Sequence, residues 1–553
     1  MKKFFALLLV VLMLLPSIVA CGEEHPDESS TPTQSSQDTT TPSESNKPQS
    51  SKPDDTTNSS DIVNPGDSSK PADSTKPTDS TSNSGSGTVT PPPKPPVDEK
   101  EPDVVTKWSG STLNVLATVW IVDAAPGAPW SQVELCVGPD DYYSKEGFGV
   151  IINSAVLNRR DFIKETYGVD INWINSRSNM IATLLSEAVI GGSENTKYHI
   201  AMPRMLEAQS IVISNTIFNV ADRKYIDLDK SYYNQAAREA YTVYDKTLFV
   251  AGDFSFLDEQ TSYLMYYNVA MTDGFDSFPD LYQMVRDGKW TIDQMTNVAK
   301  LVTKNQGDQK WTDDDTYGFG TTSLSRFFQY SGIKQVSVVD GEYKITLNDT
   351  KVSTLIDKIL TIGGAEWARS NWDGGFGAMQ LAFEEGRLLF YNEVVQKTDY
   401  FTNQTDEFKV GLLPCPKLSE AQEAYYTPCA YQSVLMCVPK ATPDREMSDY
   451  FFEILSYTGQ KYIMSAYKEN VRNKLDAETA TDSMDIVENY IFNNLCYDVG
   501  YSYGWSGLLS DVQSESYSSG KNNFTAAYSG AVEDASGTLE DWNLAWLDAT
   551  DSI

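Results

Sequence analysis

The sequence predicts an α/β protein preceded by a long N-terminal segment without secondary structure. Two observations support this prediction. From about residue 108 onward, strand patterns and helix patterns alternate along the chain, which is typical of α/β layers. Between Gly22 and Val97 there is no aromatic side chain and few apolar ones of any size, so this segment cannot bury enough apolar surface to offset its chain entropy.

The N-terminus predicts a secretory signal peptide over residues 1–20. Lys2 and Lys3 precede an apolar run, residues 4–15, and the small Ala20 marks the cleavage site. The run is shorter than the roughly 20 apolar residues that a transmembrane helix needs, and no later stretch comes close. We therefore expect a mature protein that does not span a membrane.

The residues around the cleavage site, Ile18, Val19, Ala20 and Cys21, resemble a bacterial lipobox. In a lipobox the cysteine is lipidated and becomes the new N-terminus, although the first position is usually leucine. The resemblance implies lipidation of Cys21 and a protein anchored at the extracellular face of the cell membrane, because acyl chains gain about 0.8 kcal/mol per buried CH2 group. The alternative is an ordinary signal peptide with a cysteine near its cleavage site.

Residues 21–107 are expected to comprise the lipidated cysteine and a disordered linker. The linker is rich in Ser, Thr, Pro and Asp and has a stiffer "PPPKPP" motif near its end. A flexible chain of this length has an r.m.s. span on the order of 50 Å. We expect it to hold the folded part, which begins near Trp108, clear of the lipid surface.

The charge of the chain narrows the choice of partners. The formal net charge is -34 at pH 7. Nucleic acid and anionic membrane surfaces would both be repelled at long range, so neither is expected as a partner. Membrane contact is expected through the lipid anchor alone.

The cysteines predict neither a disulfide framework nor a zinc site. Besides Cys21 the chain has an odd number of them and no CxxC pair: Cys136, Cys415, Cys429, Cys437 and Cys496. A bridge between Cys415 and Cys429 on neighbouring strands stays open. Small buried thiols are the favoured interpretation.

Local patterns predict the first strands and the helix between them. Residues 112–120 predict a buried strand, and "NSAVLNRRDFIKETYG" predicts a helix with Gly168 at its C′ position. "VDINWI", residues 169–174, alternates apolar and polar side chains and predicts a second strand.

Two later helices are predicted from their ends. Thr291 followed by Gln294 predicts a capping box ahead of the apolar face of "WTIDQMTNVAKLV". "AMQLAFEEGRLLFYNEV" predicts a helix stopped by Gly386 and a strand from Arg387 to Val394. Strand and helix therefore alternate through most of the folded part.

Four segments in this part of the chain share the features of one protein family. They are "DKTLFVAGDFSF" with "TSYLMYYNVA", then "LYQMVRDGKWTIDQM", then "LAFEEGRLLFYNEV" with "FKVGLLPCPK" and "YTPCAYQSVLMCVPKAT", and finally "YDVGYSYGWSGLLSDV". Together they resemble the family 1 extracellular solute-binding proteins, the receptors of ABC importers of the maltose-binding type. The resemblance covers residues 108–553.

The resemblance implies an α/β, two-lobed, periplasmic-binding-protein-like (type II) fold with crossing hinge strands. The first lobe is expected to contain residues 108–262 and 394–436, and the second lobe residues 263–393 and 437–553. Such lobes close around a ligand by a hinge. The resemblance also implies binding without catalysis, no cofactor and a monomer.

Sugar sites need aromatic platforms and polar side chains that hydrogen-bond strongly. The resemblance places Trp505 in a late segment where relatives have a stacking tryptophan, and it places other candidates at strand ends and in the crossing segments. The expected ligand-binding residues are Trp120, Arg204, Thr261, Tyr330, Asn392, Glu393, Tyr431 and Trp505. Core packing is the alternative role for each of them.

The expected function is capture of a carbohydrate, with an oligosaccharide as the expected ligand, and its delivery to an ABC transporter permease. The alternatives are a cell-surface glycan-docking or adhesion protein that serves no transporter, and a binding protein for peptides. The only histidines are His25 and His199, so a Ser-His-Asp triad has little support. A glycosidase with two carboxylates stays open on composition.

A metal site is not expected. The acidic loop "TKNQGDQKWTDDDTYG", residues 303–318, resembles the place of a calcium-like loop in relatives. Thr303 stands where the first aspartate would be, and the glycine and aspartates are out of EF-hand register. A solvated acidic loop is the favoured interpretation.

Overall fold

The computed structural model describes residues 99–119, 150–177, 180–192, 196–307, 310–347, 350–370, 372, 375–401, 404–405, 407–502 and 520–549. All of them belong to one compact unit, residues 84–553. The expected signal peptide, Cys21, most of the linker and Cys136 lie outside the described residues. None of the described helices combines the length and the apolar character that crossing a membrane requires.

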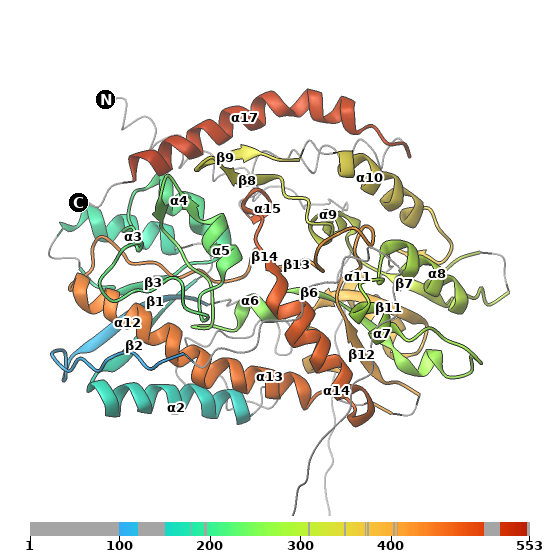
Figure 1. Cartoon of the computed structure of the whole chain (residues 1–553), viewed down its shortest axis with the longest axis horizontal. Helices are drawn as coiled ribbons and strands as arrows, with labels where there is room; N and C mark the ends of the chain where they lie inside the picture. Colours follow the sequence, from blue (N-terminus) through green and yellow to red (C-terminus); the bar gives the residue numbers. More distant parts are fainter. Residues whose placement is uncertain are drawn as a thin grey trace, which may run out of the picture. The chain divides into compact units, whose positions relative to one another are not determined.

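One part of the compact unit, the first lobe, surrounds a parallel sheet with strand order β2-β1-β3 (Figure 1). Its strands are β1 (Thr112–Val119), β2 (Asp170–Arg177) and β3 (Ile200–Met202), and the helices between them in the chain are α2 (Val150–Tyr167) and α3 (Ile181–Ile190). The predicted strand, helix and second strand in this region are confirmed.

Gly168 ends α2, as the sequence predicted. Its φ is +71°, and a Cβ added to it would lie 2.2 Å from Oγ of Ser109. Its carbonyl oxygen also accepts a hydrogen bond from the N–H of Gly110 at 2.8 Å. Only glycine satisfies both the positive φ and the close approach.

The second lobe surrounds a five-stranded mixed sheet with strand order β10-β7-β11-β6-β12. Its strands are β6 (Tyr263–Asn268), β7 (Tyr317–Gly320), β10 (Ala368–Arg369), β11 (Leu388–Val394) and β12 (Val410–Leu413). β6 runs antiparallel to both of its neighbours, β11 and β12. Its helices include α7 (Leu281–Arg286), α8 (Ile292–Val302), α10 (Thr350–Gly363), α11 (Gly375–Glu384) and α14 (Ala477–Ile486). Two separate β-sheets, each flanked by helices, confirm the predicted α/β fold class.

The predicted ends of two helices in this lobe are also confirmed. The Thr291 side chain accepts a hydrogen bond from the N–H of Gln294 at 3.3 Å and caps α8. Gly386 has a φ of +71° and separates α11 from β11, which begins at Leu388.

Shorter elements complete the two lobes. The other described α-helices are α4 (Ala208–Ile213), α5 (Gln235–Ala240), α6 (Leu257–Gln260), α9 (Phe327–Tyr330), α12 (Arg445–Thr458), α13 (Ser465–Arg472), α15 (Val499–Ser502) and α17 (Phe524–Asp548). Short strands are β4 (Thr242–Val243), β5 (Lys246–Thr247), β8 (Val336–Val339), β9 (Glu342–Ile345), β13 (Thr427–Pro428) and β14 (Leu495–Cys496). Turns of 3₁₀-helix are η3 (Met205–Glu207), η4 (Val269–Thr272), η5 (Leu324–Arg326), η6 (Val395–Tyr400) and η9 (Phe492–Asn494), and η7 (Gly459–Met464) and η8 (Val487–Ile491) are π-helical.

The chain passes from the first lobe to the second through α6, which leads directly into β6. It returns after β13, where the segment that follows bridges to the first lobe through the residue pairs Arg204 and Val434, Ala201 and Cys437, and Val250 and Met436. The return therefore lies near residues 429–437.

This path differs from the division expected from the resemblance. Residues 394–436 were expected in the first lobe, but β12 lies within that range and pairs with β6 of the second. Residues 437–553 were expected in the second lobe, but Tyr450 of α12 stacks on Trp108 with ring centroids 5.3 Å apart, and α13 packs against α2. The difference arises from tertiary packing, because β12 is a buried apolar strand that pairs with β6 in the sheet of the second lobe.

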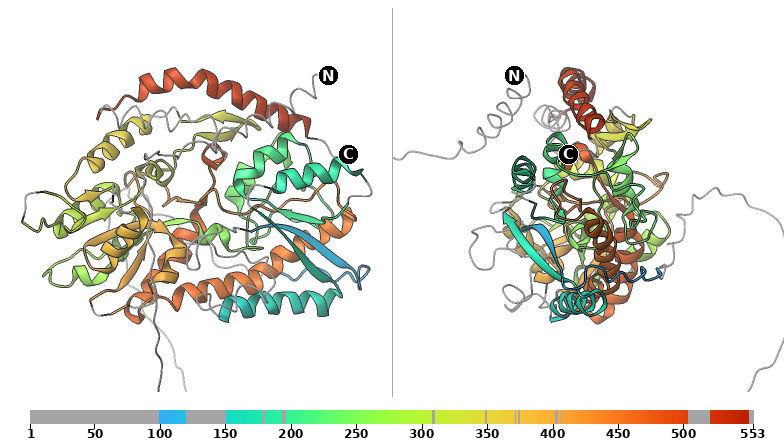
Figure 2. Two further views of the ribbon diagram at one scale, coloured as in Figure 1. Left: turned by 180° about the vertical axis from the view of Figure 1, so that it is seen from behind. Right: turned by 90° about the vertical axis from the view of Figure 1, so that its left-hand side faces the viewer.

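Two further elements connect the lobes, and we call the β8–β9 hairpin together with α17 the strap (Figure 2). The hairpin extends from the second lobe, and the Tyr343 hydroxyl donates to the carbonyl oxygen of Ala240 in the first at 2.9 Å. Near one end of α17, Asn522 donates to the carbonyl oxygen of Ser353 in α10 at 2.9 Å. At its other end the Lys246 ammonium donates to the carbonyl oxygen of Trp546 at 2.8 Å.

Candidate functional site

A group of aromatic and charged side chains lies where the first crossing enters the sheet of the second lobe. We call it the junction cluster, and it consists of Tyr263, Arg326, Glu393, Tyr431 and Tyr501. These residues come from the first position of β6, the end of η5, the strand β11, the segment after β13, and α15. The fold thus gathers five separate parts of the chain at the boundary between the lobes.

Arg326 is the buried cation of the junction cluster. Its guanidinium lies over the ring of Tyr263, 4.1 Å from the centroid, and the residue is 7% exposed. Its Nε and Nη1 atoms are buried without a hydrogen-bond acceptor. Burial alone opposes the charge, but the tyrosines and Glu393 outweigh it and raise the pKa of Arg326 above its ordinary value. A buried donor without an acceptor is costly, so this guanidinium is suited to a ligand oxygen.

Glu393 supplies the opposite charge. It is 1% exposed, and its Oε1 accepts a hydrogen bond from the N–H of Val394 at 3.0 Å, whereas its Oε2 has no partner. Burial raises the pKa of Glu393, and Arg326 and Lys397 offset part of that shift. No ion pair joins the two side chains, although each influences the charge of the other. A ligand hydroxyl can accept from the guanidinium and donate to the carboxylate at the same time.

The aromatic side chains give the cluster an apolar surface. Tyr263 is 8% exposed, whereas Tyr431 is 38% exposed and therefore accessible from solvent. The neighbouring Tyr391 hydroxyl and Gln432 Oε1 are further buried polar atoms without partners. Rings beside unpartnered donors and acceptors match the two surfaces of a sugar, its apolar face and its rim of hydroxyls.

Two of the residues predicted from the sequence lie at the lobe boundary beside this cluster. Thr261 makes a hydrogen bond through Oγ1 to Oγ of Ser433 at 2.8 Å and donates to the carbonyl oxygen of Leu257. Arg204 lies at the start of η3, where the next residue, Met205, donates its N–H to the carbonyl oxygen of Ser433 at 2.9 Å. The structure therefore brings Thr261 and Arg204 to the same returning segment that carries Tyr431.

Two other predicted residues lie beneath the cluster. The Tyr330 hydroxyl donates to Oδ1 of Asn392 at 2.9 Å, and Asn392 donates through Nδ2 to the carbonyl oxygen of Leu264 at 3.0 Å. Both Tyr330 and Asn392 are fully buried. They hold β11 against β6 and so fix the position of the next residue, Glu393.

The sequence prediction missed Arg326, Tyr263 and Tyr501, and it included two tryptophans that the structure does not describe. Trp120 and Trp505 lie outside the described residues. A local signal for Arg326 exists, because it is the only charged residue in "SLSRFFQYSG". A single charge in an apolar segment requires a partner or a ligand when it is buried.

Other places in the described chain are less suited to a ligand. No group of three or more His, Cys, Asp or Glu side chains in the described ranges could hold a metal ion. In the acidic loop, Asp315 accepts hydrogen bonds from the backbone N–H groups of Gln306 and Thr312, both at 2.7 Å.

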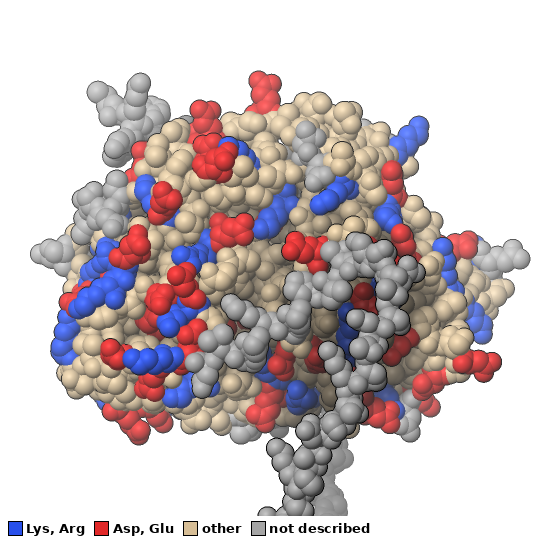
Figure 3. All heavy atoms as spheres, in the orientation of Figure 1, with Lys and Arg blue, Asp and Glu red and all other residues tan. Residues whose placement is uncertain are grey.

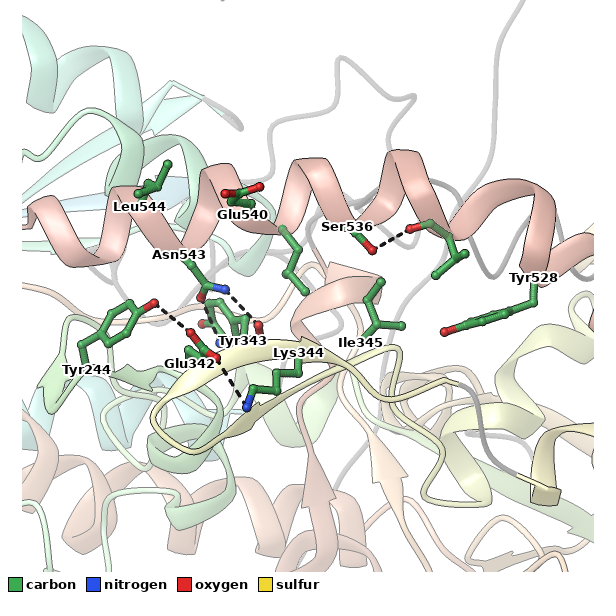
Figure 4. A pocket seen from close by; sticks show the side chains of 12 residues that line it. Tyr244, Glu342, Tyr343, Lys344, Ile345, Tyr528, Ser536, Glu540, Asn543 and Leu544 are labelled. Carbon is green, nitrogen blue, oxygen red and sulfur yellow. Dashed lines mark hydrogen bonds and ion pairs between the residues drawn. The ribbon is translucent and has the colours of Figure 1, made fainter.

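A surface cavity of about 450 Å³ lies between α17, β9 and the turn at Tyr244 (Figure 4). The polar groups of its wall, such as Asn543 and Glu342, are hydrogen-bonded to the protein.

The cysteines that the structure describes are all free thiols: Cys415, Cys429, Cys437 and Cys496. The bridge between Cys415 and Cys429 that the sequence left open is therefore not formed. Burial raises the pKa of Cys415 to about 12 and that of Cys496 to about 12, which suppresses the reactive thiolate.

No family model and no curated protein matches this chain. Among solved structures, it is similar to an ABC substrate-binding protein from Listeria monocytogenes in complex with cycloalternan, at 14% identity and a TM-score of 0.43, over 78% of this chain and 98% of the other. It is also similar to a cyclic α-maltosyl-1,6-maltose binding protein from Arthrobacter globiformis, at 12% identity and a TM-score of 0.48, over 78% and 99% of the two chains. A third is the sugar-binding protein MalE from Xanthomonas citri, at 12% identity and a TM-score of 0.49, over 79% and 99%. At these identities and TM-scores, the likenesses carry no conclusion about what this chain binds.

Proposed function

We propose that this protein is an extracellular solute-binding receptor of an ABC importer, which binds a carbohydrate at the junction cluster and passes it to a permease. An oligosaccharide is the proposed ligand. Lipidation of Cys21 would keep the receptor near the permease, and the linker would let it reorient while its effective concentration stays high. The proposal assigns binding to the chain and no bond-breaking step.

One observation carries the proposal. The Arg326 guanidinium rests on the ring of Tyr263 with two buried nitrogen atoms unpartnered, and Glu393 presents an unpartnered carboxylate oxygen from the neighbouring strand. A hydroxyl-bearing ring would satisfy both groups, and its apolar face would pack against the exposed Tyr431.

The charges around the cluster favour a neutral ligand. Arg326 is balanced by Glu393, and a net charge of -34 on the chain would repel an anion at long range. On the face seen in Figure 3, acidic and basic side chains are interspersed, so no extended patch of one sign marks a partner of high charge. A neutral glycan therefore fits better than a uronate or a phosphorylated sugar.

The test is thermal unfolding of residues 84–553, the compact unit, in the presence of neutral oligosaccharides, acidic oligosaccharides, monosaccharides and peptides. A ligand at a hundred times its dissociation constant stabilises the native state by about 2.7 kcal/mol, which gives a measurable shift of the unfolding midpoint. A shift with one class of neutral glycan supports the proposal. A shift with peptides alone would leave a transport role with another cargo, and it would contradict the carbohydrate.

A second candidate is a glycan-docking protein on the cell surface that serves no transporter. The observation that favours it is the strap, which makes hydrogen bonds to both lobes and opposes a wide opening between them. Small-angle scattering separates the two candidates, because a receptor that closes on its ligand becomes more compact at saturation, whereas a docking protein keeps its dimensions.

A further inference from the structure

The two lobes hold the strap in different ways. Its β8–β9 hairpin is continuous in the chain with the second lobe at both ends, because α9 precedes it and α10 follows it. The helix α9 is in turn bound to β11 through the Tyr330 hydroxyl and Asn392. The first lobe, in contrast, holds the strap through hydrogen bonds between segments that are distant in the sequence. Such bonds can dissociate, whereas the chain at the base of the hairpin cannot.

Tyr244 of the first lobe makes two hydrogen bonds to the tip of this hairpin. Its N–H donates to the carbonyl oxygen of Gly341 at 2.7 Å. Its hydroxyl donates to Oε2 of Glu342 at 3.3 Å, across the gap between the two hairpins that Figure 4 shows. Tyr244 and Glu342 are both half-buried, so water can take the place of these bonds when they break.

Two more residues of the same short segment also bind the strap. The carbonyl oxygen of Ala240 accepts from the Tyr343 hydroxyl at 2.9 Å, and the Lys246 ammonium donates to the carbonyl oxygen of Trp546 at 2.8 Å. Residues 240–246 therefore make hydrogen bonds to both parts of the strap, the hairpin and α17.

The backbone at Tyr244 has a conformation that a tyrosine rarely adopts. Tyr244 and Asp245 form the two-residue turn of the β4–β5 hairpin, with φ of +51° and +58°. Turns with two positive φ angles favour Asn-Gly or Asp-Gly, and the β8–β9 hairpin follows that rule with Asp340 and Gly341. A bulky side chain at a left-handed position points to a specific role, and at Tyr244 the contacts with the strap supply one.

We propose that residues 240–246 form a latch that fastens the strap to the first lobe, and that the Tyr244 side chain closes it. With the latch closed, the strap is bound to both lobes, as in this structure. With the latch open, the strap keeps its covalent connection to the second lobe, and the lobes are free to change their relative orientation at this edge. The latch does not depend on which ligand the protein binds.

Tyr244→Gly in the full chain tests the latch against a purely local role in the turn, because the two predict opposite results. Glycine removes the side chain that binds Glu342, and it also relieves the backbone at a positive φ. We expect the N–H at position 244 to exchange with solvent on the order of tenfold faster, after correction for intrinsic rates, because the latch loses a hydrogen bond to a charged group. Unchanged or slower exchange, which a relieved turn alone would give, would overturn the proposal.

Asp245→Gly is the matched control. It relieves a positive φ of +58° in the same turn, and the Asp245 side chain is exposed to solvent. We expect exchange at position 244 to stay the same or to slow in this variant. A rise equal to that of Tyr244→Gly would show that glycine loosens the turn itself, which would contradict the latch.

Tyr343→Phe tests whether the latch opens as a unit. The change removes only the hydroxyl that donates to Ala240, and it keeps the ring beside Trp546, where the centroids lie 5.9 Å apart. Exchange at position 244 should rise severalfold, although that residue is unchanged. Tyr317→Phe is the matched control, because the Tyr317 hydroxyl donates to the carbonyl oxygen of Thr312 at 2.7 Å within the second lobe. No rise at position 244 in Tyr343→Phe, or an equal rise in Tyr317→Phe, would overturn the proposal.

Discussion

The guanidinium of Arg326 lies over the ring of Tyr263 at 4.1 Å, and this contact joins the body of the second lobe to the crossing strand. Tyr263 is the first residue of β6, directly after the segment that leaves the first lobe. A ligand that binds Arg326 therefore also acts on the position where the crossing begins.

Arg326→Gln should abolish the stabilisation by ligand and should also lower the stability of the free protein. The change removes a donor to the ligand, and hydrogen bonds to charged groups are worth about 1.5–3 kcal/mol. The free protein at the same time loses the cation that balances the buried Glu393 carboxylate, and a buried charge without compensation is destabilising. Unfolding midpoints with and without glycan measure both effects.

Arg369→Gln is the matched control for that experiment. Arg369 also lies over a tyrosine, Tyr317 at 5.9 Å, but it is paired with Asp313 at 2.6 Å. We expect this variant to lose some stability and to keep the full shift with ligand. An equal loss of ligand response in both variants would mean that Arg326 acts through the fold and not through contact.

Gly168→Ala should destabilise the first lobe by more than Gly110→Ala does. Both glycines have positive φ, +71° and +86°, so each alanine bears a backbone cost of about 1 kcal/mol. At Gly168 the new Cβ would also meet the Ser109 side chain, whereas at Gly110 nothing lies within 4 Å. The difference between the two variants in urea unfolding measures the steric part alone, and equal losses would contradict the close packing at Ser109.

Lys246→Ala should loosen the C-terminal end of α17. The Lys246 ammonium donates to the carbonyl oxygens of Trp546 and Leu547, both at 2.8 Å. A cation at a helix C-terminus is worth about 0.3–1 kcal/mol, so the last turn should open more often without it. Hydrogen exchange should rise at the end of α17 and stay unchanged at its start near Asn522. A uniform rise along the whole helix would contradict this local role.

The buried thiols should resist alkylation in the native protein. Cys415 and Cys429 are buried, and burial holds the pKa of Cys415 at about 12, so its thiolate is scarce at pH 8. We expect slow reaction with iodoacetamide in buffer and fast reaction of the same thiols in guanidinium chloride. Fast labelling of Cys415 in the native state, identified by mass spectrometry, would contradict the burial.

The parts of the fold that could be predicted are those with local causes. Gly168 stops a helix because of its own φ, and Thr291 caps one through a residue three positions away. The pairing of β12 with β6 has no local cause, since it depends on which apolar strand fits beside a crossing strand more than a hundred residues earlier. For that reason, the residue ranges of the two lobes in the structure differ from the ranges expected from the sequence.

The residues of the candidate site also differ in whether the sequence could predict them. Glu393 and Tyr431 could be chosen because they stand in segments that resemble crossing segments. Arg326 is marked locally as the only charge of its segment, but its contact could not be predicted from there, because the ring of Tyr263 is distant in the sequence. Whether the predicted tryptophans take part stays a prediction.

The strap has a mechanical consequence for any movement of the lobes. A domain that is attached to another at one place can rotate in any direction, whereas a domain attached at two separate places can rotate only about the line between them. The lobes of this protein are attached both through α6 and its neighbours and through the hydrogen bonds of Tyr343 and Lys246. Any relative motion of the lobes that keeps both attachments is therefore restricted to rotation about the line between them.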